Sequence, residues 1–194
     1  YKQIMVGIFE RVFAVGNCFR AEQHATTRHL NEFTGLDLEF GMINDHHDVM
    51  DLEVELLRYI LDHLDKTVAR ELKLWNYARP EMPAEIPFLK LREAQQLIKK
   101  ETGVDHANEP DLEPGEERWL GEYAKKEFHS DFIFVTHYPT SKRPMYTYPD
   151  ETDPEFTKSF DLLFRGVEIT SGGQRFHDYH TLVKSMENKG LIAE

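Results

Sequence analysis

Two β-rich runs joined by a long polar segment constrain the fold of this chain more than any other feature. Residues 11–20 (RVFAVGNCFR) and residues 33–43 (FTGLDLEFGMI) both favour strands, and apolar and acidic residues alternate in the second run. Their succession predicts an antiparallel pair. The connecting residues, 21–32, are polar, rich in charged residues and histidine, and more numerous than a tight hairpin turn requires. Because loops of this kind often carry function, this segment is the first candidate site.

The rest of the chain predicts helices mixed with further strands. From Asp45, interpreted as an N-cap, apolar residues recur every three or four positions as far as Leu72, which predicts one long amphipathic helix. The other predicted elements are helices at residues 91–100, 113–128 and 177–189, the last ended by Gly190, and strands at residues 131–139 and 160–169. Since regular β-α-β alternation is lacking, these elements indicate the α+β class, an antiparallel β-sheet flanked by helices.

Composition and charge limit the classes of function. A chain of 194 residues with 40% hydrophobic residues can bury a sizeable core. No window approaches the roughly 20 apolar residues of a membrane span, and the first residues lack the zones of a signal peptide. We therefore expect a cytoplasmic protein with no membrane partner. The formal charge of −12 argues against a general nucleic-acid coat, so any nucleic-acid contact is expected to be local.

Cysteine and histidine do not form a recognisable metal motif. Cys18 is the only cysteine and stands in an apolar run, which favours a buried small side chain over a reactive thiol. His46, His47 and His63 lie on or near the long predicted helix, but neither cysteines nor an HExxH spacing accompany them. We interpret these histidines as part of a solvated helix face.

The first group of residues with chemical potential lies in and around the polar segment. It consists of Arg20, Glu22, Arg28, His29 and Glu32. Arginine suits a polyphosphate, because its planar fork donates two hydrogen bonds and its charge persists beside any neighbour. Two arginines at opposite ends of one loop could therefore hold two phosphates. From spacing alone, surface ion pairs with Glu22 and Glu32 remain the alternative.

The second group lies in the segment FDLLFRGVEITSGGQR, residues 160–175. Asp161 and Glu168 are separated by a strand and a turn, so their carboxylates can converge on one hard cation, to which Ser171 could add a neutral oxygen. The expected cation is Mg²⁺, which bridges phosphates and carboxylates. The alternative is that these acids only flank a glycine turn.

Three segments carry a resemblance to a known family. Residues 12–40 (VFAVGNCFRAEQHATTRHLNEFTGLDLEF) resemble motif 2 of class II aminoacyl-tRNA synthetases. Within them, the sequence RHLNEFTGLD resembles the aspartyl enzymes of archaeal and eukaryotic type. Residues 160–175 are similar to the aspartyl and asparaginyl enzymes just before their motif 3. The first residues, YKQ, resemble the QLYKQ segment of the aspartyl family. The resemblance covers nearly the whole chain and is least diagnostic from about residue 75 to 130.

The resemblance implies a set of ATP-binding residues in motif 2. Arg20 is implied to be catalytic, because it would contact both the α-phosphate of ATP and the reacting carboxylate. Glu22 would face the adenine, and Arg28 would hold the γ-phosphate of a bent ATP. His29 and Leu30 belong to the same implied ATP-binding set.

The resemblance also implies residues for the amino acid and the metal. Asp37 would accept the α-ammonium of L-aspartate, and Lys2 and Arg175 would approach its side-chain carboxylate. The implied aspartate-binding set is Lys2, Asp37, Ser171 and Arg175. The implied Mg²⁺ ligands are Asp161, Glu168 and Ser171, with Glu168 also on the ATP side.

The implied activity is that of an aspartate–tRNA ligase. Its substrates would be ATP, L-aspartate and tRNA(Asp), with tRNA(Asn) left open, and its full-length form would be a homodimer. We expect residues 1–194 to be part of the class II catalytic domain, with motif 2 near residues 11–40. Motif 1, motif 3 and an anticodon-binding domain are expected outside this segment, and activity of the isolated segment is not implied.

Three other functions remain open. An asparaginyl-tRNA synthetase shares motif 2 and the glycine turn, but we would expect it to lack a lysine at position 2. A relative could make asparagine through an adenylate without tRNA. A synthetase-like binding module without catalysis is the third, although intact Arg20, Asp161, Glu168 and Arg175 favour catalysis.

Overall fold

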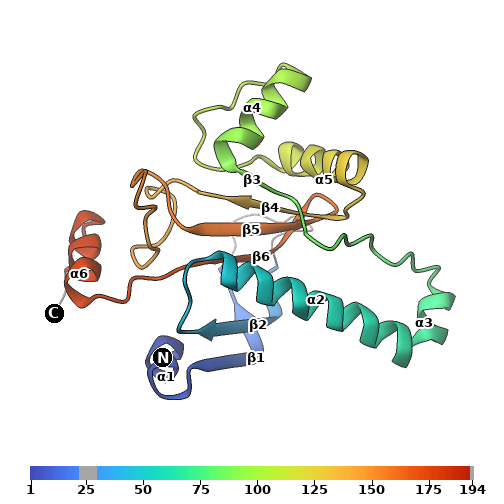
Figure 1. Cartoon of the computed structure of the whole chain (residues 1–194), viewed down its shortest axis with the longest axis horizontal. Coiled ribbons are helices and arrows are strands. Elements are labelled where there is room, and N and C mark those ends of the chain that lie inside the picture. Colours follow the sequence, from blue (N-terminus) through green and yellow to red (C-terminus); the bar gives the residue numbers. More distant parts are fainter. Residues whose placement is uncertain (22–29, 193–194) are drawn as a thin grey trace. The chain divides into compact units, whose positions relative to one another are not determined.

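The computed structural model describes residues 1–21 and 30–192 and divides the chain into two compact units, Tyr1–Asn44 and Asp45–Glu194. Figure 1 traces the elements of both units along the sequence. Within the described residues, no helix is long and apolar enough to cross a membrane.

The first unit is a helix followed by a β-hairpin. Its elements are α1 (Lys2–Phe9), β1 (Arg11–Phe19) and β2 (Glu32–Phe40). The two strands pair antiparallel without a break in register, from Arg11 opposite Phe40 to Phe19 opposite Glu32. The predicted strand pair is confirmed. The second strand ends at Phe40 instead of residue 43, and the backbone N–H of Gly41 donates to the carbonyl of Glu10, which closes the ladder.

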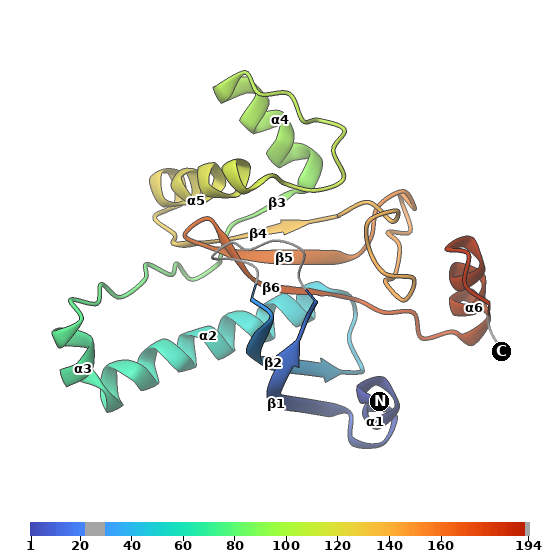
Figure 2. The ribbon, with the colours of Figure 1, turned by 180° about the vertical axis from the view of Figure 1, so that it is seen from behind.

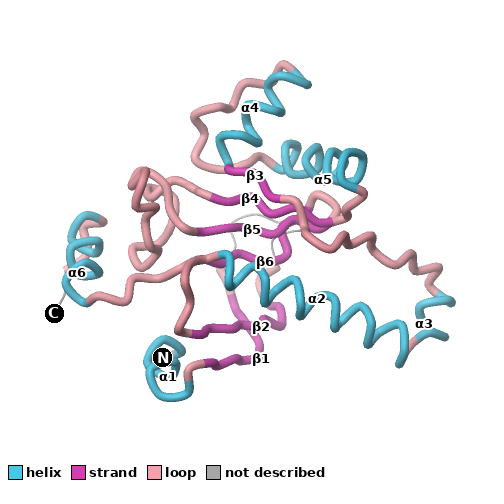
Figure 3. Tube along the Cα trace, in the orientation of Figure 1, coloured by secondary structure: helices cyan, strands magenta, loops and turns pink. Residues whose placement is uncertain are grey.

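The second unit is built on a four-stranded sheet with the order β3-β4-β5-β6. Its elements are α2 (His47–Thr67), α3 (Ala69–Leu74), β3 (Phe88–Lys90), α4 (Leu91–Thr102), α5 (Pro114–Phe128), β4 (Phe132–Thr136), β5 (Ser159–Phe164), β6 (Val167–Gly173) and α6 (Tyr179–Asn188). Figure 3 shows the strands side by side. β3 pairs parallel to β4, and the other pairs are antiparallel, so the expected antiparallel sheet carries one short parallel strand at its edge.

Two apolar clusters cover the two faces of this sheet. One joins α4 and α5 to β4 and β5, and Figure 2 shows these two helices beside the sheet from behind. The other is formed by residues of β4, β5 and α2. All five residues of β4 are buried, because both of its faces are covered. A strand in this position reads as a continuous apolar run, which is why its sequence shows no alternation. Burial of each large apolar side chain contributes about 1.5–3 kcal/mol.

The long helix predicted from Asp45 to Leu72 is wrong at both ends. The N-cap is His46, although an Asp45 carboxylate oxygen accepts a hydrogen bond from the His47 N–H at 2.8 Å. The helix ends at Thr67, whose hydroxyl donates to the carbonyl of His63 at 2.7 Å and so competes with the helical ladder. A separate short helix, α3, follows.

The single strand predicted at residues 160–169 is also wrong, because the structure has a hairpin there. β5 and β6 are joined by Arg165 and Gly166, both at positive φ, 50° and 76°. A turn of this type normally carries Asn-Gly or Asp-Gly, so Arg-Gly gave a weak signal. Tertiary contacts hold Arg165 in this conformation: its backbone N–H donates to the carbonyl of Asp131 at 2.8 Å, and its guanidinium contacts the Asp131 carboxylate at 3.3 Å.

The hairpin turn lies directly against α5. A β-carbon added to Gly121 would be 2.4 Å from the backbone nitrogen of Gly166, so helix and turn touch backbone to backbone. We predict that Gly121→Ala lowers the free energy of unfolding by about 1–3 kcal/mol, because the two backbones must separate. Gly115→Ala is the control in the same helix, since the nearest atom there is 4.0 Å away. Thermal unfolding that is equal for both variants would contradict the close contact.

Glu53 on α2 gives the sheet a pH dependence. Burial raises the pKa of its carboxyl to about 7, against the effect of a hydrogen bond with Thr170 of β6. The folded state therefore holds this proton more tightly than the unfolded state does, and stability is lost as the pH rises from about 4.5 toward 7. We predict that Glu53→Gln is more stable than the parent at pH 8, by roughly 1–3 kcal/mol, and nearly equal at pH 5.

Urea unfolding at pH 5 and pH 8 measures this difference. Glu55→Gln is the control, because Glu55 is exposed on the same helix. A Glu53→Gln gain that is the same at both pH values would show that removal of the proton is not its cause.

Candidate active site

One face of the β1–β2 hairpin carries both charged residues and several small residues. The small residues of this face are Ala14, Gly16, Cys18 and Gly35. Asp37 pairs with Ala14 and lies on the same face, and Arg20 continues the face just beyond the end of β1. The guanidinium carbon of Arg20 lies 5.2 Å from the centroid of the Phe33 ring, and its backbone N–H donates to the carbonyl of Asn31 at 2.9 Å. Because the small residues of this face leave its backbone accessible, a small ligand can approach it closely.

A second cation faces Asp37 in the same unit. The Nζ atom of Lys2, at the start of α1, lies 3.1 Å from an Asp37 carboxylate oxygen. The Lys2 side chain is 20% exposed and that of Asp37 is 54% exposed, so the pair remains open to solvent. The structure thus brings together Lys2 and Asp37, which are far apart in sequence.

The predicted ATP-binding set is described only in part. Glu22, Arg28 and His29 lie outside the described residues, and their roles stay predictions. Leu30 precedes β2 and is 54% exposed.

The three predicted metal ligands share one face of the β5–β6 hairpin. Asp161 pairs directly with Ser171, and Glu168 pairs with Leu163, two residues along the same strand from Asp161. Asp161 is buried at 5% exposure. Glu168 keeps contact with solvent on the edge strand, yet partial burial and the nearby Asp161 and Glu117 raise its pKa to about 7.

Arg143 neutralises Asp161, and sequence reasoning missed it. Its Nη2 atom donates to an Asp161 carboxylate oxygen at 2.7 Å, its Nε atom donates to the Ser159 hydroxyl at 3.2 Å, and its guanidinium carbon lies 4.0 Å from the centroid of the Tyr138 ring. Burial raises the pKa of Asp161, whereas Arg143 and a hydrogen bond with Tyr138 oppose that rise. Arg143 lies in an irregular loop, where no periodicity ties it to a strand that begins at residue 159.

This hairpin face fits a hard divalent cation. The negative charge of Asp161 disfavours ionisation of Glu168 and so raises the Glu168 pKa. Arg143 bonds to Asp161 and only partly offsets the second charge. Two carboxylates and the Ser171 hydroxyl form an all-oxygen donor set, which is the set that Mg²⁺ prefers.

Arg175 follows the end of β6 and is oriented by an aromatic ring. Its guanidinium carbon lies 4.3 Å from the centroid of the Tyr146 ring, and its backbone pairs with that of Thr147. The next residue, Phe176, donates its backbone N–H to the carbonyl of Tyr146 at 2.9 Å. The guanidinium is planar by its own bonding, and its fork of N–H donors suits a carboxylate.

The interpretation of His46 as part of a solvated helix face is wrong. Its side chain is 2% exposed, because the chain turns inward at the start of α2 and places this ring against His47 and His137. His47 remains half exposed, and His63 stacks on Tyr59 at the surface of the helix. Helical periodicity could not show this, because residue 46 precedes the first turn.

The whole chain, residues 1–194, matches the family described as "tRNA synthetases class II (D, K and N)". It is 50% identical over 194 residues to the aspartate–tRNA(Asp/Asn) ligase of Thermus thermophilus, a match that covers 100% of this chain and 45% of that protein. It is 36% identical over 198 residues to the human cytoplasmic aspartate–tRNA ligase, covering 100% of this chain and 40% of that protein. The chain thus spans less than half the length of these relatives.

Solved structures show the same relationship. The aspartyl-tRNA synthetase from Entamoeba histolytica superposes with a TM-score of 0.90 at 35% identity, over 98% of this chain and 40% of that one. The asparaginyl-tRNA synthetase from Pyrococcus horikoshii, complexed with asparaginyl-adenylate, superposes with a TM-score of 0.84 at 28% identity, over 98% of this chain and 44% of that one.

The burial of the Arg143–Asp161 pair predicts a large cost for its disruption. We expect Arg143→Met to lower the free energy of unfolding by about 3–5 kcal/mol, since Asp161 would keep a buried charge without its partner. Lys142→Met is the control on the next residue: its ion pair with Asp111 is exposed at 45% and 42%, so about 0–1 kcal/mol is expected. Adding Asp161→Asn to Arg143→Met should recover part of the loss. Chemical denaturation that gives equal costs for the two single variants would contradict this role of Arg143.

Proposed function

Because the chain belongs to the class II tRNA synthetases for aspartate, lysine and asparagine, we propose that the protein containing it is an aspartate–tRNA ligase. It activates L-aspartate with ATP and transfers the aspartyl group to tRNA(Asp). The relative at 50% identity is named a ligase for both tRNA(Asp) and tRNA(Asn), so tRNA(Asn) is a second candidate acceptor. We further propose that residues 1–194 form part of the catalytic domain, with motif 2 near residues 11–40, and that the full-length protein is a cytoplasmic homodimer.

The observation that carries the choice of aspartate is the Lys2–Asp37 ion pair on the charged face of the hairpin. Free aspartate has one ammonium group and two carboxylates. Asp37 would accept the ammonium, and Lys2 would turn from Asp37 to the side-chain carboxylate. Asp37 would then exchange the cation of Lys2 for the ligand ammonium, and Lys2 would exchange the carboxylate of Asp37 for a ligand carboxylate. Asparagine offers Lys2 a neutral amide instead, so the cation at position 2 favours aspartate.

Arg175 would supply a second carboxylate contact. Its planar fork can donate two parallel hydrogen bonds to a carboxylate, whereas an amide would present one acceptor and one donor. The Tyr146 ring, 4.3 Å from the guanidinium carbon, restricts the positions of this fork before the ligand arrives, which reduces the entropy lost on binding. Ser171, on the same hairpin as Asp161, would add a hydroxyl to the aspartate-binding or the metal-binding set.

The chemistry requires positioned charges and no covalent enzyme intermediate. An oxygen of the aspartate α-carboxylate bonds to the α-phosphorus of ATP as the bond to pyrophosphate breaks, which gives aspartyl-adenylate. The terminal 3′-hydroxyl of tRNA then bonds to the activated carbonyl carbon, and AMP leaves with the bonding electrons as the hydroxyl proton is lost. Arg20 would hold the α-phosphate and the reacting carboxylate together. The same role in ATP binding is proposed for Glu22, Arg28, His29 and Leu30.

Asp161, Glu168 and Ser171 would hold Mg²⁺. When bound, the ion supplies positive charge to the phosphates of ATP. The residues themselves contribute the buried carboxylate of Asp161, whose orientation Arg143 and Tyr138 fix, and the partly buried carboxylate of Glu168, which would face ATP. Magnesium binding should therefore lower the pKa of Glu168 from about 7, since a cation favours the ionised form.

The activity is tested by ATP–pyrophosphate exchange in the full-length protein. We expect exchange that depends on aspartate and not on asparagine, followed by charging of tRNA(Asp). Exchange with asparagine alone would favour the asparaginyl enzyme, exchange without charging of any tRNA would favour the relative that makes asparagine, and no exchange would favour a binding module. Each of these three results would overturn the proposal.

The roles of Lys2 and Arg175 predict a change in KM for aspartate. A charge-assisted hydrogen bond contributes about 1.5–3 kcal/mol, so Lys2→Ala and Arg175→Ala should each raise the aspartate KM roughly 10- to 150-fold. The KM for ATP should stay nearly constant. Lys2→Ala should also narrow the preference for aspartate over asparagine. Lys184→Ala is the control, because Lys184 is exposed on α6. An Arg175→Ala enzyme with an unchanged aspartate KM would rule out the proposed role of that residue.

A further inference from the structure

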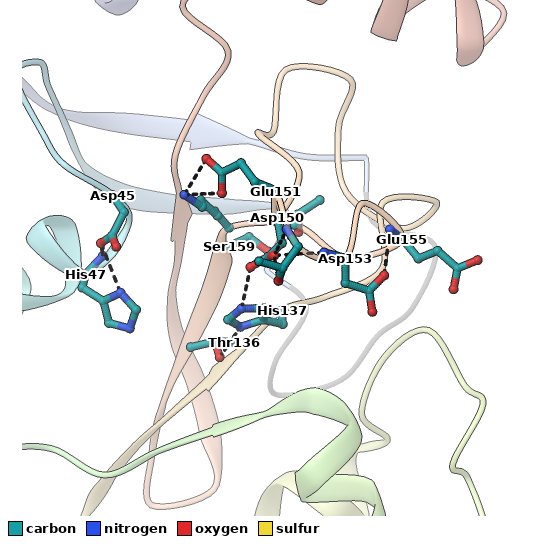
Figure 4. A network of polar contacts seen from close by, with 12 residues as sticks. Asp45, His47, Thr136, His137, Asp150, Glu151, Asp153, Glu155 and Ser159 are labelled. Atoms are coloured by element: carbon teal, nitrogen blue, oxygen red, sulfur yellow. Dashed lines mark hydrogen bonds and ion pairs between the residues drawn. The ribbon is translucent and has the colours of Figure 1, made fainter.

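Three potential metal ligands gather where the chain enters α2. Each of Asp45, His46 and His47 offers one ligand atom, and these atoms all lie within 4.8 Å of one another. Figure 4 shows the His47 ring turned toward the Asp45 carboxylate, where the Nδ1–Oδ1 distance is 3.1 Å. The three residues belong to one compact unit.

His46 is the second and independent observation. Its side chain is 2% exposed, and within the described residues neither of its ring nitrogens has a hydrogen-bond partner. Buried polar groups are almost always paired, and an unpaired one costs about 1–3 kcal/mol. A ligand that bonds to a ring nitrogen of His46 would remove this cost.

The surroundings hold the His46 ring in place without satisfying it. The His46 and His47 ring centroids are 4.3 Å apart, and the His137 ring meets His46 edge-on at 5.6 Å. Both nitrogens of His137 are already engaged, Nδ1 with the Thr136 hydroxyl at 2.9 Å and Nε2 with Asp150 at 3.3 Å, as Figure 4 shows. His137 therefore supports His46 and is not itself counted as a ligand.

We propose that Asp45, His46 and His47 form a binding site for Zn²⁺ or a similar first-row transition-metal ion. Two imidazoles and one carboxylate are donors that Zn²⁺ accepts, whereas Mg²⁺ prefers oxygen atoms alone. This set of ligands is separate from Asp161 and Glu168. Three protein ligands leave one position of a tetrahedral zinc ion for solvent.

Two physical terms limit the affinity of this site. Ligands at about 2.0–2.1 Å from a tetrahedral zinc ion are roughly 3.3 Å apart, so ligand atoms that lie up to 4.8 Å apart must approach one another by up to about 1.5 Å on binding. The N-terminus of α2 also repels a cation, and the Asp45 carboxylate opposes that repulsion. We therefore expect micromolar rather than picomolar binding.

The test is a titration of the untagged, chelator-stripped protein with ZnCl₂ by isothermal calorimetry. We expect one equivalent to bind. His47→Gln and Asp45→Asn should each weaken binding at least 10-fold, and His63→Gln, on the same helix outside the cluster, should leave it unchanged. The changed side chains are substantially exposed, at 45% for His47 and 39% for Asp45, so the variants should fold, which circular dichroism checks.

Two further measurements make the assignment specific. Zinc should raise the melting temperature of the parent and of His63→Gln but not of His47→Gln, because only a ligand bound to the folded state stabilises it. Cobalt(II) should give a visible absorption spectrum typical of nitrogen and oxygen ligands, which excess zinc removes and excess magnesium does not. Absence of saturable zinc binding, or a stoichiometric site that survives both His47→Gln and Asp45→Asn, would overturn the proposal.

Discussion

A buried carboxylate in the central part of the sheet is the constraint on which the second unit depends. Asp161 stands in β5 between Phe160 and Leu162, which are 1% and 0% exposed, and a charge there is unfavourable without a partner. The partner, Arg143, comes from the long connection between β4 and β5. Isolated backbone bridges order this connection, between Pro139 and Phe156 and between Pro149 and Thr157. The connection between β4 and β5 therefore has a definite conformation, since it holds Arg143 against the buried carboxylate of Asp161.

The same arrangement separates packing from chemistry on the two sides of β5. Alternate residues of the strand, Phe160 and Leu162, pack on the α2 side, where they belong to an entirely apolar cluster. Asp161 and Leu163 point to the other side, which holds both apolar packing and the carboxylates. A strand buried on both faces thus presents its charge only where Arg143 and Tyr138 can reach it. Rigid packing on one side fixes the polar atoms on the other.

The sequence predicted the elements whose signals are local. The prediction failed for elements whose conformation depends on contacts with residues distant in the sequence. Strong periodicity and terminal signals predicted the hairpin of β1 and β2, and also α4, α5 and α6, to within a few residues. Arg165 and Gly166 form a turn because Asp131 and α5 hold it, and neither contact is visible in the local pattern. The three-residue β3 was missed because it pairs with residues far along the chain.

For the candidate site, the resemblance identified contiguous motif residues but not their supports. The sequence motifs of their segments identified Lys2, Asp37, Asp161 and Ser171. Arg143 supports Asp161 from a loop without periodicity. The buried ring of His46 packs against His137, which lies 91 positions away in the sequence. Such supports are determined by packing between segments, which a single sequence does not display.

The tight turn between β5 and β6 has a consequence for the order in which the molecule folds. Only two residues close this hairpin, so its loop-closure entropy is small compared with that of the parallel pairing between β3 and β4. Asp161, Glu168 and Ser171 can therefore come together early, before Arg143 has been placed. At that stage the repulsion between the two carboxylates opposes the hairpin that brings them together. The residues proposed to bind the metal thus place two like charges together, and Arg143 partly offsets them once it bonds to Asp161.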